Sequence, residues 1–162
     1  STIFSLFLLS CSNPQNSTPT IEENQVGIIK GDDFRSKAMM KFTDAYVNND
    51  LNSVSDLFTD DAKIMVNDAD LTFSEMAAGF SSGHNYFDNI RHEDRDAFTM
   101  HYKKGDIAGS IFTHYWYTWK ATSKKTGEEI SLRGYAWMKW RGDKVEATYN
   151  AFDPSLYNAQ LE

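Results

Sequence analysis

Four side chains in this sequence are candidates for acid–base chemistry: Asp153, Tyr149, His84 and His114. An aspartate held in an apolar cavity has a raised pKa, so Asp153 can serve as a general base or acid near neutral pH. A tyrosine hydroxyl can donate a hydrogen bond to an oxyanion, and an imidazole can transfer protons. Ordinary roles also fit: Asp153 precedes Pro154 and can cap a C-terminal segment, Tyr149 can be a core residue bonded to the backbone, and His84 can be a surface histidine.

The hairpin at Gly142-Asp143 decides which of these side chains share a face of the sheet. A two-residue turn at this point pairs Ala136 with Tyr149 and places Asp153 at the end of the same face. That face is otherwise mostly apolar, so we expect it to pack toward the helices and a cavity. This register predicts that Asp153 points inward.

Aromatic residues are concentrated in the second half of the chain, most densely in the segment 110–122. If the loop at Thr126-Gly127 is a plain even loop, the odd-numbered aromatic residues of 115–119 face the cavity. A glycine bulge in that loop instead turns His114 and Trp116 inward, and the sequence leaves both arrangements open. The residues that we expect to line a pocket are Tyr46, Tyr115, Tyr117, Trp119, Leu132, Ala136 and Met138.

Other kinds of site lack a signature. His92 and His101 have no ligand-like spacing to other His, Cys or carboxylate residues, so we expect no metal site. The sequence has no glycine-rich phosphate loop and no nucleophile elbow, and we expect no cofactor. Acidic residues number 23 and basic residues 16, and the resulting net charge of −7 argues against a nucleic-acid partner.

The first ten residues form an apolar run that is much shorter than the roughly 20 residues of a membrane-spanning helix. The run ends in Leu8-Leu9-Ser10-Cys11, which resembles the lipobox at which bacterial lipoproteins are acylated on cysteine. We expect residues 1–10 to be a signal-peptide remnant, Cys11 to carry a lipid and residues 11–33 to form a polar tether. The alternative is a buried apolar strand that ends in an ordinary cysteine. The lipoprotein interpretation implies the periplasm or outer membrane of a Gram-negative-type bacterium, with membrane contact through the lipid alone.

The spacing of apolar residues predicts three helices before the sheet. One starts at Phe34, a short one covers 51–58, and a third starts at the capping box Thr72–Glu75 and extends to Ile90. Alternating, β-rich segments predict strands at 63–67, 97–103, 110–122, 130–141 and 144–152. Helices followed by a meander of long strands indicate an α+β fold. In such a fold the helices pack on a strongly curved antiparallel or mixed sheet, forming a cone with a central pocket.

This order of elements, with Arg141-Gly142-Asp143-Lys144-Val145 followed by Tyr149 and Asp153, resembles the nuclear transport factor 2-like superfamily and its SnoaL-like polyketide cyclase branch. The resemblance covers 34–162, which we expect to be one domain. It implies a cystatin-like α+β roll, and it implies that Asp153 occupies the position of the acid–base residue of the cyclases. One departure is the turn, which reads Gly-Asp where Asp-Gly is usual.

Two classes of function remain open. The first is a binding domain that holds a small hydrophobic molecule in the cone at the cell envelope. The alternative is a cofactor-free acid–base enzyme that uses Asp153 as general base. Both remain open because a fold does not by itself determine a function. The opposite face of the sheet is rich in aromatic and polar residues, including Arg133, Tyr135 and Trp137, and predicts a homodimer through the sheet.

Overall fold

The computed structural model describes residues 20–161. The expected signal-peptide remnant and the acylation site at Cys11 lie outside the described residues. Among residues 20–161, no helix is both long and apolar enough to cross a membrane.

The helical segments are α1 (Phe34–Val47), the 3-10 helix η1 (Leu51–Leu57), α2 (Phe73–Gly83) and α3 (Ser155–Asn158). Helix α1 begins at Asp33, whose carboxylate accepts a 2.9 Å hydrogen bond from the backbone N–H of Ser36. Helix α2 begins with the predicted capping box, in which the side chains of Thr72 and Glu75 each accept a hydrogen bond from the other's backbone N–H. These side chains satisfy N–H groups that the first turn of a helix leaves unpaired.

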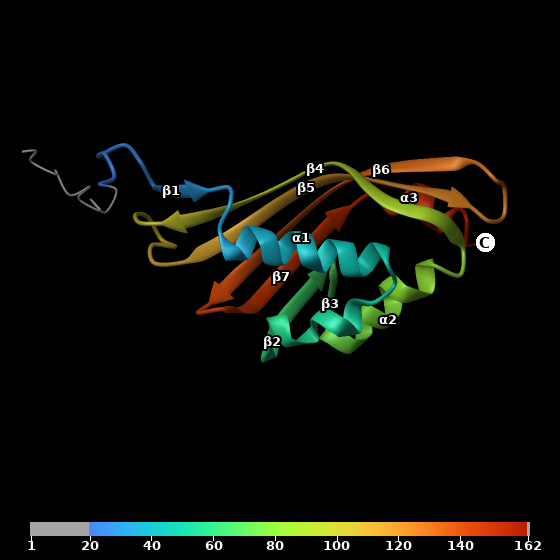
Figure 1. Cartoon of the computed structure of the whole chain (residues 1–162), viewed down its shortest axis with the longest axis horizontal. Helices are drawn as coiled ribbons and strands as arrows, with labels where there is room; N and C mark the ends of the chain where they lie inside the picture. The colour runs from blue at the N-terminus through green and yellow to red at the C-terminus, as the bar shows by residue number, and fades with distance from the viewer. Residues whose placement is uncertain (1–19, 162) are drawn as a thin grey trace, which may run out of the picture.

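The strands are β1 (Gly27–Lys30), β2 (Phe58–Val66), β3 (Ala69–Leu71), β4 (Phe87–Tyr102), β5 (Ile111–Ser123), β6 (Glu129–Arg141) and β7 (Lys144–Phe152). They form one sheet in the order β1-β4-β5-β6-β7-β2-β3, in which β2 and β7 run parallel and the other neighbours run antiparallel. Figure 1 shows α1 lying across this sheet, with α2 beside β2 and β3. The predicted α+β class with a curved mixed sheet is confirmed.

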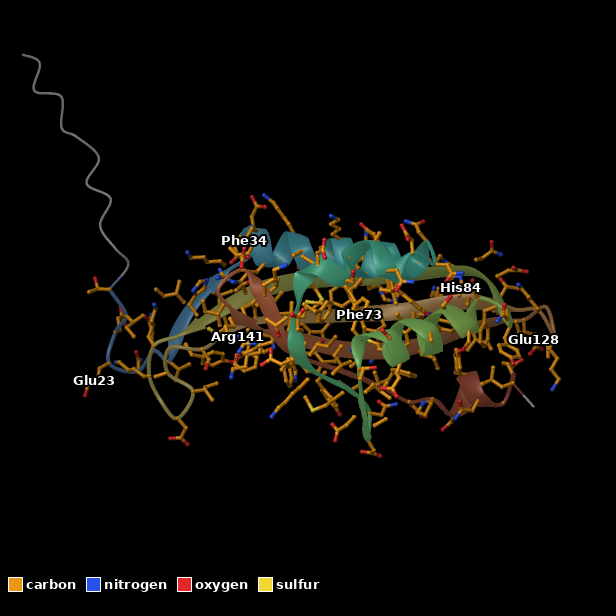
Figure 2. The ribbon with its side chains drawn as sticks, turned by 90° about the horizontal axis from the view of Figure 1, so that it is seen from below. Glu23, Phe34, Phe73, His84, Glu128 and Arg141 are labelled. Atoms are coloured by element: carbon orange, nitrogen blue, oxygen red, sulfur yellow. The ribbon has the colours of Figure 1, made fainter. Side chains whose placement is uncertain are left out.

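The main core lies between α1 and the inner face of the sheet, which we define as the face covered by α1 and α2. Met39 and Phe42 of α1 are buried against Tyr115 and Met138 of the central strands. Figure 2 shows the two ends of this layered structure, with Phe34 and Arg141 at one end and His84 and Glu128 at the other.

Strand β1 corrects the expected boundary between tether and domain. Residues 27–30 pair with β4, so the folded part includes residues that we had assigned to the tether. The ammonium group of Lys104 also donates to the carbonyl oxygens of Glu22 and Glu23, at 3.0 and 3.1 Å. These contacts are made to the backbone of the segment, so its polar composition does not reveal them.

Helix α2 is shorter than expected, because it ends at Gly83 and the chain enters β4 at Phe87. The residues 87 and 90 that we assigned to the helix therefore belong to a strand. This strand contains two β-bulges, each with one extra residue, near Asn89 and Asp94, where φ is 54° and 46°. Asn and Asp adopt this left-handed conformation more readily than most residues. The bulges break the alternation by which a strand is recognised in a sequence.

A third bulge changes the register of β6 and β7. The tight turn pairs Arg141 with Lys144 as expected, but Lys139 pairs with Ala147, so Glu146 has no opposite residue. A one-residue shift moves every later side chain of the strand to the other face. The inner face of β7 therefore carries Thr148 and Asn150 in place of the odd-numbered residues.

Candidate functional site

A cavity of about 180 Å³ lies inside the cone, between the helices and the inner face of the sheet. Its walls include all seven residues expected to line a pocket: Tyr46, Tyr115, Tyr117, Trp119, Leu132, Ala136 and Met138. Of the two arrangements of β5, the structure has the plain even loop, because Thr122 pairs with Glu129 and the odd-numbered aromatic residues face inward. The cavity is comparable to an engineered apolar cavity of about 150 Å³ that binds benzene.

Two small residues in the middle of β6 shape the cavity wall. Gly134 pairs with Tyr117, and the Tyr117 ring lies so close over Gly134 that a methyl group there would overlap it. Ala136 pairs with Tyr115 on one side and with Asn150 on the other. A short side chain between two longer ones leaves room that neither fills.

His92 is a polar residue of the cavity wall that sequence reasoning missed. Its Nδ1 lies 2.9 Å from the hydroxyl oxygen of Tyr115, and its ring stacks on Tyr117 with centroids 4.2 Å apart. Burial, with a smaller contribution from the positive charge of Arg95, lowers the pKa of His92 to about 4. The imidazole is therefore neutral at neutral pH and can exchange hydrogen bonds with a ligand without carrying charge.

Tyr46 connects α1 to the far side of the cavity. Its hydroxyl accepts a 2.7 Å hydrogen bond from the indole Nε1–H of Trp119. Burial raises the pKa of Tyr46 and of Tyr117, so both phenols stay protonated at neutral pH. Neither side chain supplies a charge to the cavity.

No Asp, Glu, Lys or Arg is among the described residues that line the cavity. The charges of Arg95 and Asp44 act on His92 and Tyr115 from outside the wall, and these two side chains form an ion pair that is 2.5 Å long and partly exposed. The described part of the wall is therefore mainly aromatic and aliphatic, and its polar side chains are uncharged at neutral pH.

Asp153 is not an inward acid, which corrects our first candidate for catalysis. It is exposed, and its carboxylate accepts hydrogen bonds from the backbone N–H and the hydroxyl of Ser155, at 2.9 and 2.6 Å. These bonds lower its pKa. The bulge at Glu146 turned Asp153 away from the cavity, and the capping role is the one observed.

Tyr149 also lies on the other face from the one predicted. The same register shift pairs Tyr149 with Trp137 on the outer face of the sheet, where the two rings lie 6.1 Å apart. Tyr149 therefore cannot contact a molecule held in the cavity, and its proposed role there is corrected.

The two candidate histidines also lie outside the cavity wall. His84 ends α2, and its Nε2 donates to the carbonyl oxygen of Tyr46 at 3.0 Å, which ties the ends of the two helices together. His114 lies on the outer face, with its Nδ1 2.7 Å from the hydroxyl of Tyr135. Partial burial lowers the pKa of His114.

The C-terminal segment closes one end of the cavity. Tyr157 of α3 lines it and packs against Phe87, with ring centroids 4.9 Å apart. Gly83 has no side chain to meet the Tyr157 hydroxyl, and Ser123 donates a 2.8 Å hydrogen bond to the side chain of Gln160. The Tyr157 ring and the Gln160 side chain thus connect this segment to the strands.

The described residues contain no cluster of three or more His, Cys, Asp or Glu side chains that could hold a metal ion. On the opposite side of the sheet, a set of stacked rings forms what we call the outer aromatic face. Its members are Phe98, Phe112, His114, Trp116, Tyr135, Trp137 and Tyr149. Trp116 is 45% exposed, a large fraction for tryptophan.

Comparisons with solved structures identify the fold. The chain is similar to a putative hydroxylase from Streptomyces galilaeus, with a TM-score of 0.58 and 15% identity over 79% of this chain and 95% of that one. It is similar to a Catenulispora acidiphila protein of ketosteroid isomerase-like fold, with a TM-score of 0.54 and 15% identity over 76% and 91% of the two chains. A SnoaL-like polyketide cyclase from Agrobacterium tumefaciens matches with a TM-score of 0.51 and 11% identity over 77% and 95%. No protein-family model and no curated protein matches the sequence. At these identities the similarity shows the nuclear transport factor 2-like cone fold alone.

Proposed function

We propose that this chain binds a small hydrophobic molecule inside its cone. The observation that carries the proposal is the cavity of about 180 Å³, whose described wall is aromatic and aliphatic and has no charged side chain. An apolar ligand gains about 25 cal/mol for each Å² that it removes from water. Aromatic walls with a few polar groups are typical of small-molecule sites.

Binding is favoured over acid–base catalysis because the cavity lacks the acid on which catalysis would depend. Asp153, which the resemblance to polyketide cyclases put in that role, is exposed and caps Ser155. The remaining titratable groups are His92, with a pKa of about 4, and phenols with raised pKa values. Such groups are weak bases and weak acids at neutral pH, since efficient proton transfer needs a pKa near the working pH.

The setting of this binding domain is also a proposal. We propose acylation at Cys11 and anchoring at the cell envelope, on the sequence pattern Leu8-Leu9-Ser10-Cys11. We further propose a homodimer through the outer aromatic face, supported by the exposed Trp116 and by the aromatic composition that interfaces favour.

The binding proposal is tested by closing the cavity from the sheet. Indane, a neutral two-ring hydrocarbon, is titrated into the 162-residue chain while tryptophan fluorescence and thermal stability are recorded. We expect saturable binding to the wild type, and a loss of about tenfold or more in affinity for Ala136→Leu, because the added side chain fills the cavity.

The matched control is Ala151→Leu. Ala151 pairs with Tyr135 and its side chain lies on the outer face of the neighbouring strand, so the same substitution should leave indane affinity unchanged. Absence of indane binding to the wild type, or equal affinities for the two variants, would contradict the proposal.

A further inference from the structure

Gly79 of α2 lies where the cavity meets solvent. It is the only exposed residue among the described residues that line the cavity, and each of the others is buried or half-buried. A Cβ atom built at Gly79 would meet no atom within 4 Å beyond its own stretch of helix, so the space beside it is empty. These observations place an opening of the cavity beside the middle of α2.

Nothing in the fold requires glycine at this position. Gly79 lies in the interior of α2, and its φ is not positive, so its backbone geometry is one that any residue adopts in a helix. Glycine is a poorer helix former than alanine, because its backbone loses more conformational freedom on folding. Gly79 therefore weakens α2 without relieving a clash, and what it supplies is open space at the cavity wall.

Gly83, one helical turn later, lacks a side chain for a different reason. Residues four apart lie on the same face of a helix, so Gly79 and Gly83 face the same way. At Gly83 the neighbour on this face is the C-terminal segment, because a Cβ there would lie 2.7 Å from the hydroxyl oxygen of Tyr157. The two elements α2 and α3 lie at the same end of the molecule (Figure 1). Tyr157 thus fills the space beside Gly83 and leaves the space beside Gly79 empty.

The C-terminal segment forms the other side of this opening, because Tyr157 also lines the cavity. No residue of 154–161 is buried, whereas Met76 and Ala77 of α2 are. Segments that bury little surface open locally at a lower cost in free energy than core elements do. The side formed by Tyr157 is therefore the one that can yield to a passing molecule, and α2 is the fixed side.

We infer that Gly79 sets the width of the entrance, and that a small hydrophobic molecule enters and leaves the cavity between α2 at Gly79 and the Tyr157 ring. This inference rests on the proposed binding function and adds the residue that controls the rate of entry. A larger side chain at position 79 would stand in the entrance, because no other group occupies that space. Residue 79 thus acts on the rate of exchange, whereas Ala136, deeper in the wall, acts on affinity.

The test compares Gly79→Leu with the wild type. Indane is titrated into the ¹⁵N-labelled full chain, and the association and dissociation rates are obtained by line-shape analysis of the Trp119 indole N–H signal. Trp119 lines the cavity, and its signal is assigned by its absence in Trp119→Phe. We expect both rates to fall about tenfold while the dissociation constant changes by less than about threefold, because a side chain in the entrance obstructs passage in both directions.

Three further variants provide the controls. Ala78→Leu adds the same side chain at an exposed residue of α2 that does not line the cavity, so both rates should stay unchanged. Gly79→Ala should raise the midpoint of thermal unfolding, because alanine favours the helix and nothing there clashes with a methyl group. Tyr157→Ala removes the opposite side of the entrance and should speed association about threefold or more.

The outcomes distinguish this inference from the function on which it rests. Absence of saturable indane binding to the wild type overturns both. Saturable binding with the same rates in Gly79→Leu and the wild type, or equal slowing by Ala78→Leu, overturns the entrance at Gly79 and leaves the binding function standing. Weaker binding by Gly79→Leu at an unchanged association rate also overturns it, because residue 79 would then belong to the binding wall. A lower unfolding midpoint for Gly79→Ala would show that the fold needs the glycine, and unchanged association in Tyr157→Ala would remove Tyr157 from the entrance.

Discussion

The two faces of the central strands are built from the same kinds of residue, but one lines a cavity and the other forms a surface of packed rings. On β5, the odd-numbered aromatic residues from Tyr115 to Trp119 face the cavity, and His114 and Trp116 alternate with them on the outer aromatic face. Each face has a histidine bonded to a tyrosine hydroxyl, His92 to Tyr115 inside and His114 to Tyr135 outside, at 2.9 and 2.7 Å.

What differs is how the rings are spaced and buried. Outside, His114 stacks between neighbouring rings, while Trp116 remains 45% exposed. Inside, Tyr115 is fully buried, but Gly134 is covered by the Tyr117 ring and the short side chain of Ala136 leaves a void. The same chemistry therefore gives a packing surface on one side and a binding space on the other, and the small residues of β6 make the difference.

The largest effect is expected where the inner face has no tolerance for added volume. Gly134→Ala places a methyl group into the ring of Tyr117, which is held between His92 and Tyr115 with centroids 4.2 and 5.1 Å away. Because the ring must leave its position between two other rings to admit the methyl group, we expect a loss of about 3 kcal/mol in the free energy of unfolding, measured by urea denaturation.

The control for this clash is the double variant Gly134→Ala with Tyr117→Leu. Leucine removes the ring atoms that the methyl group meets, so adding Gly134→Ala to Tyr117→Leu should change stability far less than adding it to the wild type. Equal losses in both backgrounds would show that the glycine is needed for its backbone and not for its space.

The second prediction compares the two histidines by pH. His92 has a pKa of about 4 in the fold and about 6.5 when unfolded, so between these values the unfolded chain binds the extra proton. Stability from His92 is complete above pH 6.5 and falls as the pH drops toward 4, by up to about 3 kcal/mol.

Between pH 6.5 and 4, replacing His92 with Gln should reduce the slope of the unfolding free energy with pH. The reduction should correspond to nearly one proton bound on unfolding. His114→Gln is the matched change on the outer face, and it should flatten the curve less because burial around His114 is only partial. Unfolding free energies at half-unit pH steps measure both slopes. Identical curves for wild type and His92→Gln would mean that His92 is not buried as described.

The sequence predicts the inner-face residues of β5 and β6 much better than those of β4 and β7. The alternation of β5 and β6 identifies six of the seven expected cavity residues, because a long regular strand keeps its period, and helical spacing identifies the seventh, Tyr46. The capping box at Thr72 likewise predicts where α2 begins, since it is a local signal.

The failures at β4 and β7 follow from bulges. The extra residue at Glu146 reverses the faces of β7, so Asp153 and Tyr149 were placed inside while Asn150 was missed. The uninterrupted register was plausible because it would pair Lys139 with Glu146, two opposite charges that the bulge also keeps together at 2.8 Å. Two further bulges in β4 hid His92. A bulge depends on long-range packing and changes few residue types. The one local signal in β4 is the residue type at Asn89 and Asp94, because Asn and Asp adopt positive φ more readily than most residues.

The third prediction removes one hydroxyl from each face. Tyr115→Phe leaves the Nδ1 of His92 without its partner in a buried wall, which should cost about 1–2 kcal/mol of stability. Tyr135→Phe removes the equivalent bond on the outer face, where water can replace it, and should cost about 0.5 kcal/mol or less. Urea denaturation of the two variants measures the difference, and equal losses would contradict the contrast between the faces.

The smallest effect on stability is expected at the exposed edge of the outer aromatic face, where the change should appear in mass instead. If this face is a dimer interface, Trp116→Glu places a charge among stacked rings of the partner and should convert a dimer to a monomer in light scattering. The unfolding free energy of the separated chain should change by only about 0.5 kcal/mol, because Trp116 is nearly half exposed within one chain. Lys41→Glu reverses an exposed charge on α1, which covers the opposite face of the sheet, so it is the control and should leave the mass unchanged. A monomeric wild type would remove the dimer and leave the outer rings as a packing surface of a single chain, while the cavity on the inner face would be unaffected.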